Sequence, residues 1–324
     1  MKLLKTLKKF IYRVLTSAPV VAIGSKIFKI VAATGKNSGI CLKNGFLPIP
    51  VHFYSPVPDI SDLEQRNIWE IRSKLPGIDL NPELQMEFLS LIGKDYAEEC
   101  VWPPEQTGNP AEFYVNNPSF SYGCAAATHC MIKKFTPRTF VEVGSGMSSL
   151  IISKALSSNT QKSNYIIVDP YPNDVIRNKL INLDILYQSR VETLTPSFFD
   201  QLITNDILFI DSGHCVRIGG DVNFLLLDVL PRLNPGVIIH FHDISLPYEY
   251  PKAYAIDETF RQFWTEQYML QSFLSCNRDF EILLAMNYLM NNHKDFFKKT
   301  FNHYDPSLHK FISGSFWIRR KVQV

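Results

Sequence analysis

Hydrophobic and polar positions change their pattern near Pro137, and the second half of the chain has the clearer pattern. Short apolar runs of strand length alternate there with stretches of helical periodicity. The predicted strands are 138–143, 164–168, 184–188, 206–211, 236–242, 278–284 and 313–321, with late helices over 256–274 and up to about 299. Strands that alternate with helices of ordinary length are typical of a parallel sheet covered on both faces. The pattern therefore predicts an α/β fold with a doubly wound, Rossmann-like sheet.

The part before this sheet is less regular. Helices are expected over 60–75, 81–96 and 123–135, and a Trp-, Pro- and Asn-rich loop precedes the last of them. Loops of this length inside a compact protein often act as lids over a functional site. We therefore expect three parts: an N-terminal extension at 1–58 that ends in an irregular linker, a helical and loop cover region at 59–122, and an α/β domain at 123–324.

The first residues predict a basic amphipathic helix. Over residues 3–15, Leu, Ile, Val and Phe fall on one face and Lys or Arg on the rest. Residues 1–58 hold nine of the 33 Lys and Arg and none of the 31 Asp and Glu. Such a helix either lies on an anionic membrane surface, through residues 1–15, or docks on its own domain. Nucleic-acid binding is not expected, because interleaved aromatic side chains are missing.

The composition indicates a folded protein in a reducing compartment. The chain is 46% apolar and 20% charged, as globular proteins are. Its six cysteines form no CxxC pair, which favours free thiols over disulfides or zinc ligands. No apolar run reaches the roughly 20 residues of a spanning helix, and lysines interrupt the N-terminus too often for a signal peptide. We expect a cytoplasmic protein, in which the first helix could contact the inner face of the membrane.

A glycine turn follows the first predicted strand. In "FVEVGSGMSSL", Gly144 and Gly146 allow a tight turn and a close approach of the backbone to a ligand, with a helix N-terminus beyond. A dinucleotide fingerprint needs Gly or Ala where this chain has Ser149. Binding of another nucleotide by the same sheet stays an alternative.

This turn resembles the first motif of class I S-adenosylmethionine-dependent methyltransferases, acid-x-Gly-x-Gly-x-Gly. Glu142, Gly144 and Gly146 match it, and Ser148 stands in place of the last glycine. The second strand ends at Asp169, where the family has an acid that binds the ribose hydroxyls. The resemblance implies S-adenosylmethionine as cofactor, bound by Glu142, Gly144, Ser145, Gly146, Ser148, Asp169 and Asp211, and a last strand antiparallel to the others.

The resemblance extends from about residue 117 to 320 through "MIKKFTPRTFVEVGSGMSS", "LFIDSGH", "DVNFLLLDVLPRLNPGV" and "HFHDISLPYEYP". These segments look like a bacterial group of the superfamily whose members often modify polysaccharides or glycosylated metabolites. Catechol- and macrocin-type O-methyltransferases are similar in having acidic metal ligands after the fourth and fifth strands.

Two neighbouring strand ends carry the candidate chemistry. Asp211 and His214 end the fourth predicted strand, and His242 and Asp243 end the fifth. Because the carboxyl ends of parallel strands share one edge, these side chains should meet beside the cofactor. The resemblance implies that Asp211 and Asp243 bind a divalent metal such as Mg²⁺ or Mn²⁺ and that His214 deprotonates the acceptor. His242 stands where those enzymes have a second acid, so it is a further candidate ligand.

The same chemistry works without a metal, with His214 as general base beside Asp211 or Asp243. His240 alternates with His242 and should point to the other face of the sheet, in a structural or cofactor-side role. Asp221 precedes an apolar run and reads as a helix N-cap rather than a ligand.

The sequence therefore predicts an S-adenosylmethionine-dependent methyltransferase acting on a hydroxyl of a sugar, polysaccharide or glycosylated small molecule. Transfer to nitrogen or a carboxylate, and a non-catalytic cofactor-binding scaffold at a membrane assembly, are the alternatives. Asn117 and Tyr122 could touch cofactor or substrate, and Tyr248 and Tyr250 could shape the acceptor pocket; packing roles are equally open. The oligomeric state is not predicted.

Overall fold

The computed structural model describes residues 2–259, 261–309 and 311–322, and the chain divides into two compact units. The first unit, called the N-terminal unit below, comprises Met1–Ile68 and Ala255–Phe263. The second, called the body, comprises Trp69–Tyr254 and Trp264–Val324. The boundary at Ile68 lies inside the predicted cover region, and the three-part division of the chain stays a prediction.

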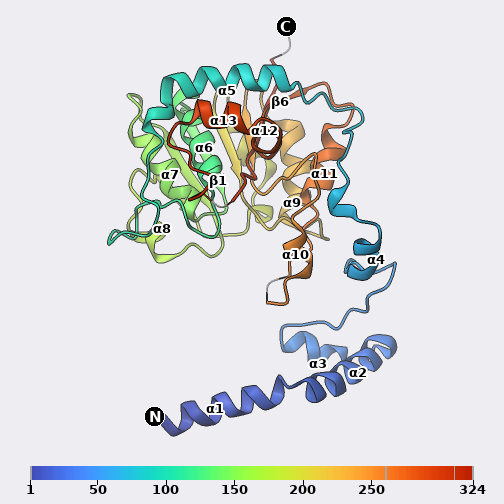
Figure 1. The fold of residues 1–324 in the computed structure, drawn as a ribbon. Helices are drawn as coiled ribbons and strands as arrows, with labels where there is room; N and C mark the ends of the chain where they lie inside the picture. Colours follow the sequence, from blue (N-terminus) through green and yellow to red (C-terminus); the bar gives the residue numbers. More distant parts are fainter. Residues whose placement is uncertain (1, 260, 310, 323–324) are drawn as a thin grey trace. The chain divides into compact units, whose positions relative to one another are not determined.

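The N-terminal unit is built from short helices (Figure 1). They are α1 (Lys2–Leu15), α2 (Ala18–Thr34), α3 (Ser38–Lys43) and α4 (Ile60–Gln65). The predicted amphipathic helix is confirmed as α1. The predicted helix over 60–75 is shorter. It ends at Gln65, Asn67 has a left-handed φ of +51° that helical geometry does not allow, and only the turn η1 (Ile68–Glu70) follows.

No single helix among the described residues is long and apolar enough to cross a membrane. Lys5–Leu15 and Ala18–Thr34 together meet the length and composition of one crossing, but the two helices meet at a bend of 61°.

The body contains one seven-stranded sheet, and all seven predicted strands are present. They are β1 (Thr139–Val143), β2 (Asn164–Val168), β3 (Ile185–Tyr187), β4 (Ile207–Ile210), β5 (Ile238–Phe241), β6 (Phe280–Ala285) and β7 (Phe316–Arg320). Their order is β3-β2-β1-β4-β5-β7-β6. Only β7 runs against its neighbours, so the expected sheet with one antiparallel C-terminal strand is confirmed.

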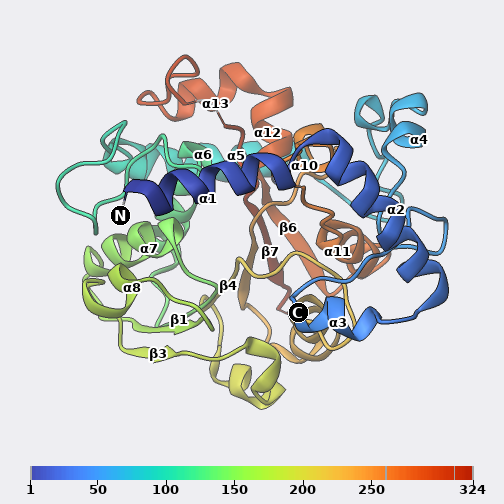
Figure 2. The same cartoon turned by 90° about the horizontal axis from the view of Figure 1, so that it is seen from below.

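Helices cover both faces of this sheet (Figure 2). They are α5 (Pro82–Tyr96), α6 (Tyr122–Phe135), α7 (Met147–Ser157), α8 (Asp174–Asn178), α9 (Asp221–Asn223), α11 (Glu266–Leu274), α12 (Met286–Asn292) and α13 (Lys294–Thr300), with α10 (Lys252–Ile256) at the unit boundary. A π-helix, η5 (Phe224–Val229), follows α9, and the short 3₁₀ helices are η2 (Ala97–Glu99), η3 (Val191–Thr193), η4 (Pro196–Gln201) and η6 (Leu230–Arg232). The chain leaves β1 for β2 in one direction and β4 for β5 in the other. Right-handed crossovers therefore place α7 and the α9–η6 segment on opposite faces.

The sheet interior is apolar on both sides, as expected for parallel strands covered twice. Every residue of β4 and of β5 is buried. The reversal of direction between β1 and β4 opens a crevice at the carboxyl ends of these strands, which is where such sheets bind ligands.

Two late helices differ from the prediction. The one expected over 256–274 is helical only in α10 and α11, and the one expected up to 299 is divided between α12 and α13 by His293. The start of α11 is fixed by a long-range contact, because the backbone N–H groups of Thr265 and Glu266 both donate to the carbonyl of His214. Such a contact is invisible to local periodicity.

Candidate functional site

The glycine turn after β1 brings two strand ends into contact. Gly144 has a φ of +82°, and a Cβ placed on it would lie 1.8 Å from the carbonyl oxygen of Asp211. Only glycine therefore allows the end of β1 to pass the end of β4. Gly146 precedes α7, and a Cβ on it would meet no atom within 4 Å. The first glycine closes the scaffold, whereas the second leaves open space at a helix N-terminus.

A cavity of about 440 Å³ lies at these strand ends. This is the size of ordinary small-molecule and cofactor sites. Four of the predicted cofactor residues line it, namely Gly144, Ser145, Asp169 and Asp211. Sequence reasoning missed other polar lining residues, namely Arg190, Glu192, Ser212 and Arg217.

The acid at the end of β2 is held in place from two sides. The Ser145 hydroxyl donates to Asp169 Oδ2, and the Tyr171 backbone N–H donates to Asp169 Oδ1 at 2.7 Å. The residue is 8% exposed and faces the cavity. Its carboxylate is thus fixed where two vicinal hydroxyls of a ligand could donate to it.

Glu142 and Ser148 lie behind the cavity rather than on its wall. Glu142 is fully buried, and its carboxylate accepts from Ser148 Oγ at 2.7 Å, from Ser149 Oγ at 3.0 Å and from the Tyr165 hydroxyl. Burial raises the pKa of Glu142 to about 8, although these three donors oppose the rise. The group links β1, β2 and the first turn of α7, and direct cofactor contact by Glu142 and Ser148 stays a prediction.

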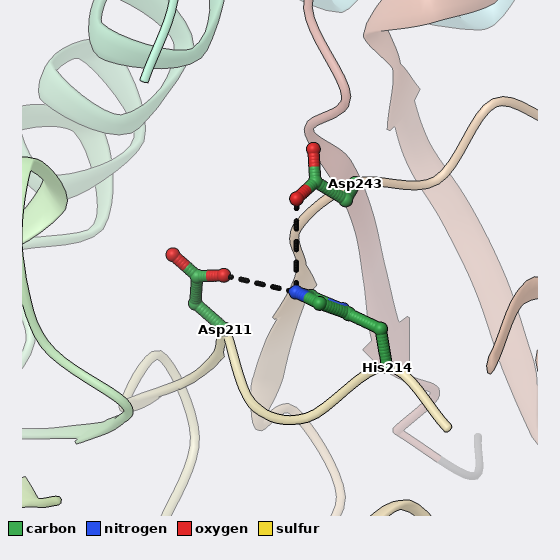
Figure 3. A group of neighbouring side chains, drawn as sticks. All are labelled: Asp211, His214 and Asp243. Atoms are coloured by element: carbon green, nitrogen blue, oxygen red, sulfur yellow. Dashed lines mark ion pairs between the residues drawn. The ribbon is translucent and has the colours of Figure 1, made fainter. Parts of the chain in front are cut away.

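The predicted strand-end residues come together as a cluster (Figure 3). His214 Nε2 lies 3.4 Å from Asp211 Oδ1 and 3.6 Å from Asp243 Oδ2. One potential ligand atom from each of the three residues lies within 4.8 Å of those of the other two. The arrangement suits either a cation between the carboxylates or a proton held on the imidazole.

Unusual backbone geometry aims two of these side chains. His214 and Asp243 have φ angles of +55° and +56°, which non-glycine residues adopt at a cost. Gly314 packs against Asp243 so closely that a Cβ on it would lie 2.8 Å from Asp243 Cα. The body therefore holds this left-handed conformation by surrounding contacts, as is common at functional sites.

A third carboxylate at the site was not predicted from the sequence. Glu266 Oε2 lies 2.7 Å from His214 Nδ1, and Glu266 is 1% exposed. Burial lowers the pKa of His214, but hydrogen bonds and charge from Asp211 and Glu266 outweigh it and raise that pKa to about 10. Burial raises the pKa of Asp211, but His242 and His214 together bring it well below its usual range. At this pKa the His214 imidazole is protonated at neutral pH.

His242 reaches the same carboxylates from β5. Its Nδ1 lies 3.3 Å from both Asp211 Oδ1 and Asp243 Oδ2, and its ring stacks on Phe120 at 5.0 Å. Neither of its ring nitrogens has a well-formed hydrogen bond, although the residue is buried. Burial lowers the pKa of His242, but the charges of Asp243 and Asp211 outweigh it and raise that pKa well above its usual range, so this imidazole would bind a metal ion only after losing its proton. The thiol of Cys124 lies close to it, and despite burial the charge of His242 lowers the pKa of Cys124 to about 7.

His240 has the predicted structural role. It is fully buried, its Nε2 lies 2.8 Å from Ser315 Oγ, and its ring stacks on Phe209 at 3.8 Å. The helix-cap prediction for Asp221 was wrong, because Gly220 occupies the N-cap and Asp221 Oδ2 instead accepts from the backbone N–H of Gly213 at 2.6 Å. Asp221 thereby supports the turn between Asp211 and His214 and lines the cavity.

The four other candidates lie outside the lining of this cavity. The Asn117 amide is buried and donates to Tyr114 and Phe120 carbonyls, and the Tyr122 hydroxyl donates to the Cys100 carbonyl at 3.1 Å. The Tyr248 hydroxyl accepts from Asn292, and the Tyr250 hydroxyl accepts from the Gln267 backbone N–H. These hydrogen bonds are those of packing residues.

Comparisons with known proteins bear on the family of this chain. Residues 141–244, which include every predicted catalytic residue, match a family model described as a methyltransferase domain. An uncharacterized protein of Archaeoglobus fulgidus is 34% identical over 169 residues, which cover 49% of this chain and 75% of that protein.

Solved structures of methyltransferases resemble this chain only loosely. A plantazolicin methyltransferase in complex with a desmethyl-plantazolicin analog and S-adenosylhomocysteine is 11% identical, with a TM-score of 0.40 over 75% of this chain and 100% of that chain. A putative methyltransferase from Thermobifida fusca is also 11% identical, with a TM-score of 0.37 over 78% of this chain and 96% of that chain. Overlaps this loose carry no information on the acceptor.

The strand order, the glycine turn and the acidic end of β2 define a class I methyltransferase fold. The chain belongs to the same family as the archaeal protein, and it is an S-adenosylmethionine-dependent methyltransferase.

Proposed function

We propose that this chain transfers a methyl group from S-adenosylmethionine to a hydroxyl oxygen of a sugar, polysaccharide or glycosylated small molecule. One observation carries the proposal: Asp211 lines the cavity below the glycine turn and also pairs with His214 at 3.4 Å. Asp211 thus connects the proposed cofactor cavity to the candidate base.

The residues of the cavity fit the cofactor. Asp169 would accept from the ribose hydroxyls, and the open space at Gly146 would admit a ligand against the α7 N-terminus. When bound, S-adenosylmethionine supplies an activated methyl group on its sulfonium, and the sulfur keeps the electron pair of the broken bond.

His214 would take the proton of the acceptor hydroxyl on Nε2, because Nδ1 is engaged by Glu266 at 2.7 Å. Its own proton must leave first, since its pKa is about 10 in the ligand-free site. A cation beside Asp211 and Asp243 offsets the charge of these carboxylates and so lowers the pKa of His214. A sulfonium or a divalent metal ion would each have this effect.

A hydroxyl acceptor suits this edge of the sheet, because four carboxylates and two arginines line the cavity. Asp211, Asp221 and Glu192 all line the cavity, and each carboxylate can accept from hydroxyl groups. Sugars present several such donors at once. An amine acceptor would find the same carboxylates, so the nature of the acceptor atom is decided by turnover.

A divalent cation, Mg²⁺ or Mn²⁺, is the second part of the proposal. Asp211, Asp243 and His242 would hold it. His242 Nδ1 lies 3.3 Å from Asp211 Oδ1 and 3.3 Å from Asp243 Oδ2, and ligand atoms of one small cation lie roughly 3 Å apart. The ion would stabilise the negative charge on the acceptor oxygen. His214 would then remain available for the proton.

The test is calorimetry with S-adenosylhomocysteine, followed by turnover on a panel of glycans, amines and carboxylic acids. We expect binding and methylation of hydroxyl-bearing acceptors, with activity lost in chelator and regained with Mg²⁺ or Mn²⁺. Turnover of amines or acids alone would overturn the acceptor class, and full activity in chelator would overturn the metal. Binding without turnover of any acceptor would indicate a cofactor-binding scaffold.

A further inference from the structure

The N-terminal unit exposes an unusual amount of apolar surface. Twenty large apolar side chains between Leu7 and Tyr54 are exposed, and Cys41 is the only buried residue among those described in this unit. Apolar exposure on this scale is typical of a binding surface.

The apolar side chains of α1 form one continuous face. Leu7, Phe10, Ile11 and Val14 recur three or four residues apart, and each is between 44% and 64% exposed. Lysines at 5, 8 and 9 fall outside this face. A helix of 14 residues with such a division is not stable alone in water, so its apolar face needs a partner.

The second helix repeats this design. Val20, Ile23, Ile27 and Ile30 follow the same spacing along α2 and are exposed, whereas Lys26 and Lys29 fall on another side. None of the 17 residues of α2 is buried. Beyond α3, Phe53 and Tyr54 are 81% and 85% exposed. Tyr is enriched at the membrane–water interface, and Phe occurs on the apolar face of interfacial segments.

The positive charge of the N-terminal unit indicates that its binding partner is negatively charged. Residues 1–58 carry nine Lys and Arg and no Asp or Glu, so the apolar faces are flanked by positive charge without internal compensation. A bilayer with anionic headgroups offers an apolar interior beside a negative surface, which matches both features together.

We propose that residues 2–54 are an interfacial anchor that lies in the plane of an anionic lipid bilayer. An in-plane position fits better than a crossing, because α1 and α2 have 14 and 17 residues, below the roughly 20 needed to span, and they meet at 61°. Lysines distributed along both helices also stay at the headgroup level in this position.

The test is co-sedimentation of the full-length protein with vesicles of phosphatidylcholine alone or mixed with phosphatidylglycerol. We expect binding to the mixed vesicles, weak binding to the neutral ones, and release at high salt. A matched pair of variants isolates the charge: Lys8→Glu/Lys9→Glu changes adjacent lysines in α1, and Lys298→Glu/Lys299→Glu changes adjacent lysines in α13 of the body.

Because each lysine near an anionic surface contributes about fivefold to binding, the α1 variant should bind about 30-fold or more weakly, and the α13 variant as wild type does. A second variant, Phe10→Ser, should weaken binding about tenfold without changing charge. Unchanged affinity for S-adenosylhomocysteine would show that each variant is folded.

Three results would overturn the proposal. Equal binding to neutral and anionic vesicles would show that the anionic lipid is not required. Release by detergent but not by high salt would indicate a spanning segment. Failure to bind any vesicle would leave the apolar faces to the body or to a second copy of the chain, which fluorescence at a label in α1 and sedimentation equilibrium would distinguish.

Discussion

The two units of this molecule use apolar residues in opposite ways. The body buries them in a sheet whose central strands β4 and β5 have no exposed residue, and only seventeen of its large apolar side chains are exposed. The N-terminal unit, much the shorter, exposes twenty between Leu7 and Tyr54 alone. The same apolar residue types thus make a self-sufficient core in one unit and a surface that needs a partner in the other.

The charges differ in the same way. In the body, opposite charges converge, and His214 lies within 3.6 Å of three carboxylates. In residues 1–58 no acid accompanies the nine basic residues. Opposite charges that converge in a buried cleft are typical of a catalytic site. Uncompensated charge around an apolar face is typical of binding to an oppositely charged surface.

The largest expected effect separates these two roles. His214→Gln removes the proposed base, and methyl transfer should fall by about 10²- to 10⁴-fold while vesicle binding is unchanged. The matched control is His129→Gln, because His129 is also buried and paired with a carboxylate, Glu99, at 3.0 Å but lies on α6 outside the cavity. Initial rates with labelled cofactor measure the effect. Equal losses in the two variants would show that His214 acts through stability and not through chemistry.

The second prediction concerns a left-handed glycine in each unit, replaced by alanine. Gly144 and Gly45 have φ angles of +82° and +81°, but a Cβ on Gly45 would meet no atom within 4 Å. Gly45→Ala should therefore cost only about 1 kcal/mol locally, the penalty of left-handed geometry. Gly144→Ala adds a collision with the Asp211 carbonyl and should destabilise the body by about 3 kcal/mol or more, with loss of cofactor binding.

Thermal unfolding followed by circular dichroism measures both glycine variants. A Gly144→Ala variant that melts as Gly45→Ala does would mean that the ends of β1 and β4 can separate, and the tight contact of these strand ends would not be required.

A smaller effect concerns the charge around His214. Glu266→Gln keeps a hydrogen-bond acceptor for Nδ1 but removes a charge that raises the pKa of His214. The low-pH limb of the kcat/KM profile should therefore move to lower pH, and the plateau should fall about tenfold because the ring is held less firmly. Glu99→Gln, beside His129, is the control and should leave the profile unchanged. An unchanged low-pH limb in Glu266→Gln would show that Glu266 does not set the pKa of the base.

Much of the body could be predicted from the sequence because its signals are local. The strands are short apolar runs, and the turn after β1 requires a glycine at position 144, because a side chain there would collide with the Asp211 carbonyl. The convergence of Asp211, His214 and Asp243 followed from topology alone, since adjacent parallel strands end at one edge.

The unpredicted parts depend on distant contacts. Glu266 lies 52 residues from His214 along the chain, in a segment whose periodicity indicated the middle of a long helix. The break before α11 exists because the His214 carbonyl accepts from the N–H groups of Thr265 and Glu266, which a continuous helix would use internally. The left-handed geometry of His214 and Asp243 likewise comes from packing that no local pattern records.

The smallest effect tests whether the two units unfold independently. Asn173 caps α8 in the body by accepting from the N–H groups of Val175 and Ile176, and Asp59 caps α4 in the N-terminal unit by accepting from those of Ser61 and Asp62. Either cap replaced by Ala loses about 1 kcal/mol of helix stability. Asn173→Ala should lower the Tm of the body by about 2–4 °C, because α8 belongs to its cooperative fold. Asp59→Ala should leave that Tm unchanged, because α4 lies in a unit with almost no buried residues. Calorimetry of both variants measures this difference, and an equal drop in Tm would mean that the N-terminal unit unfolds together with the body.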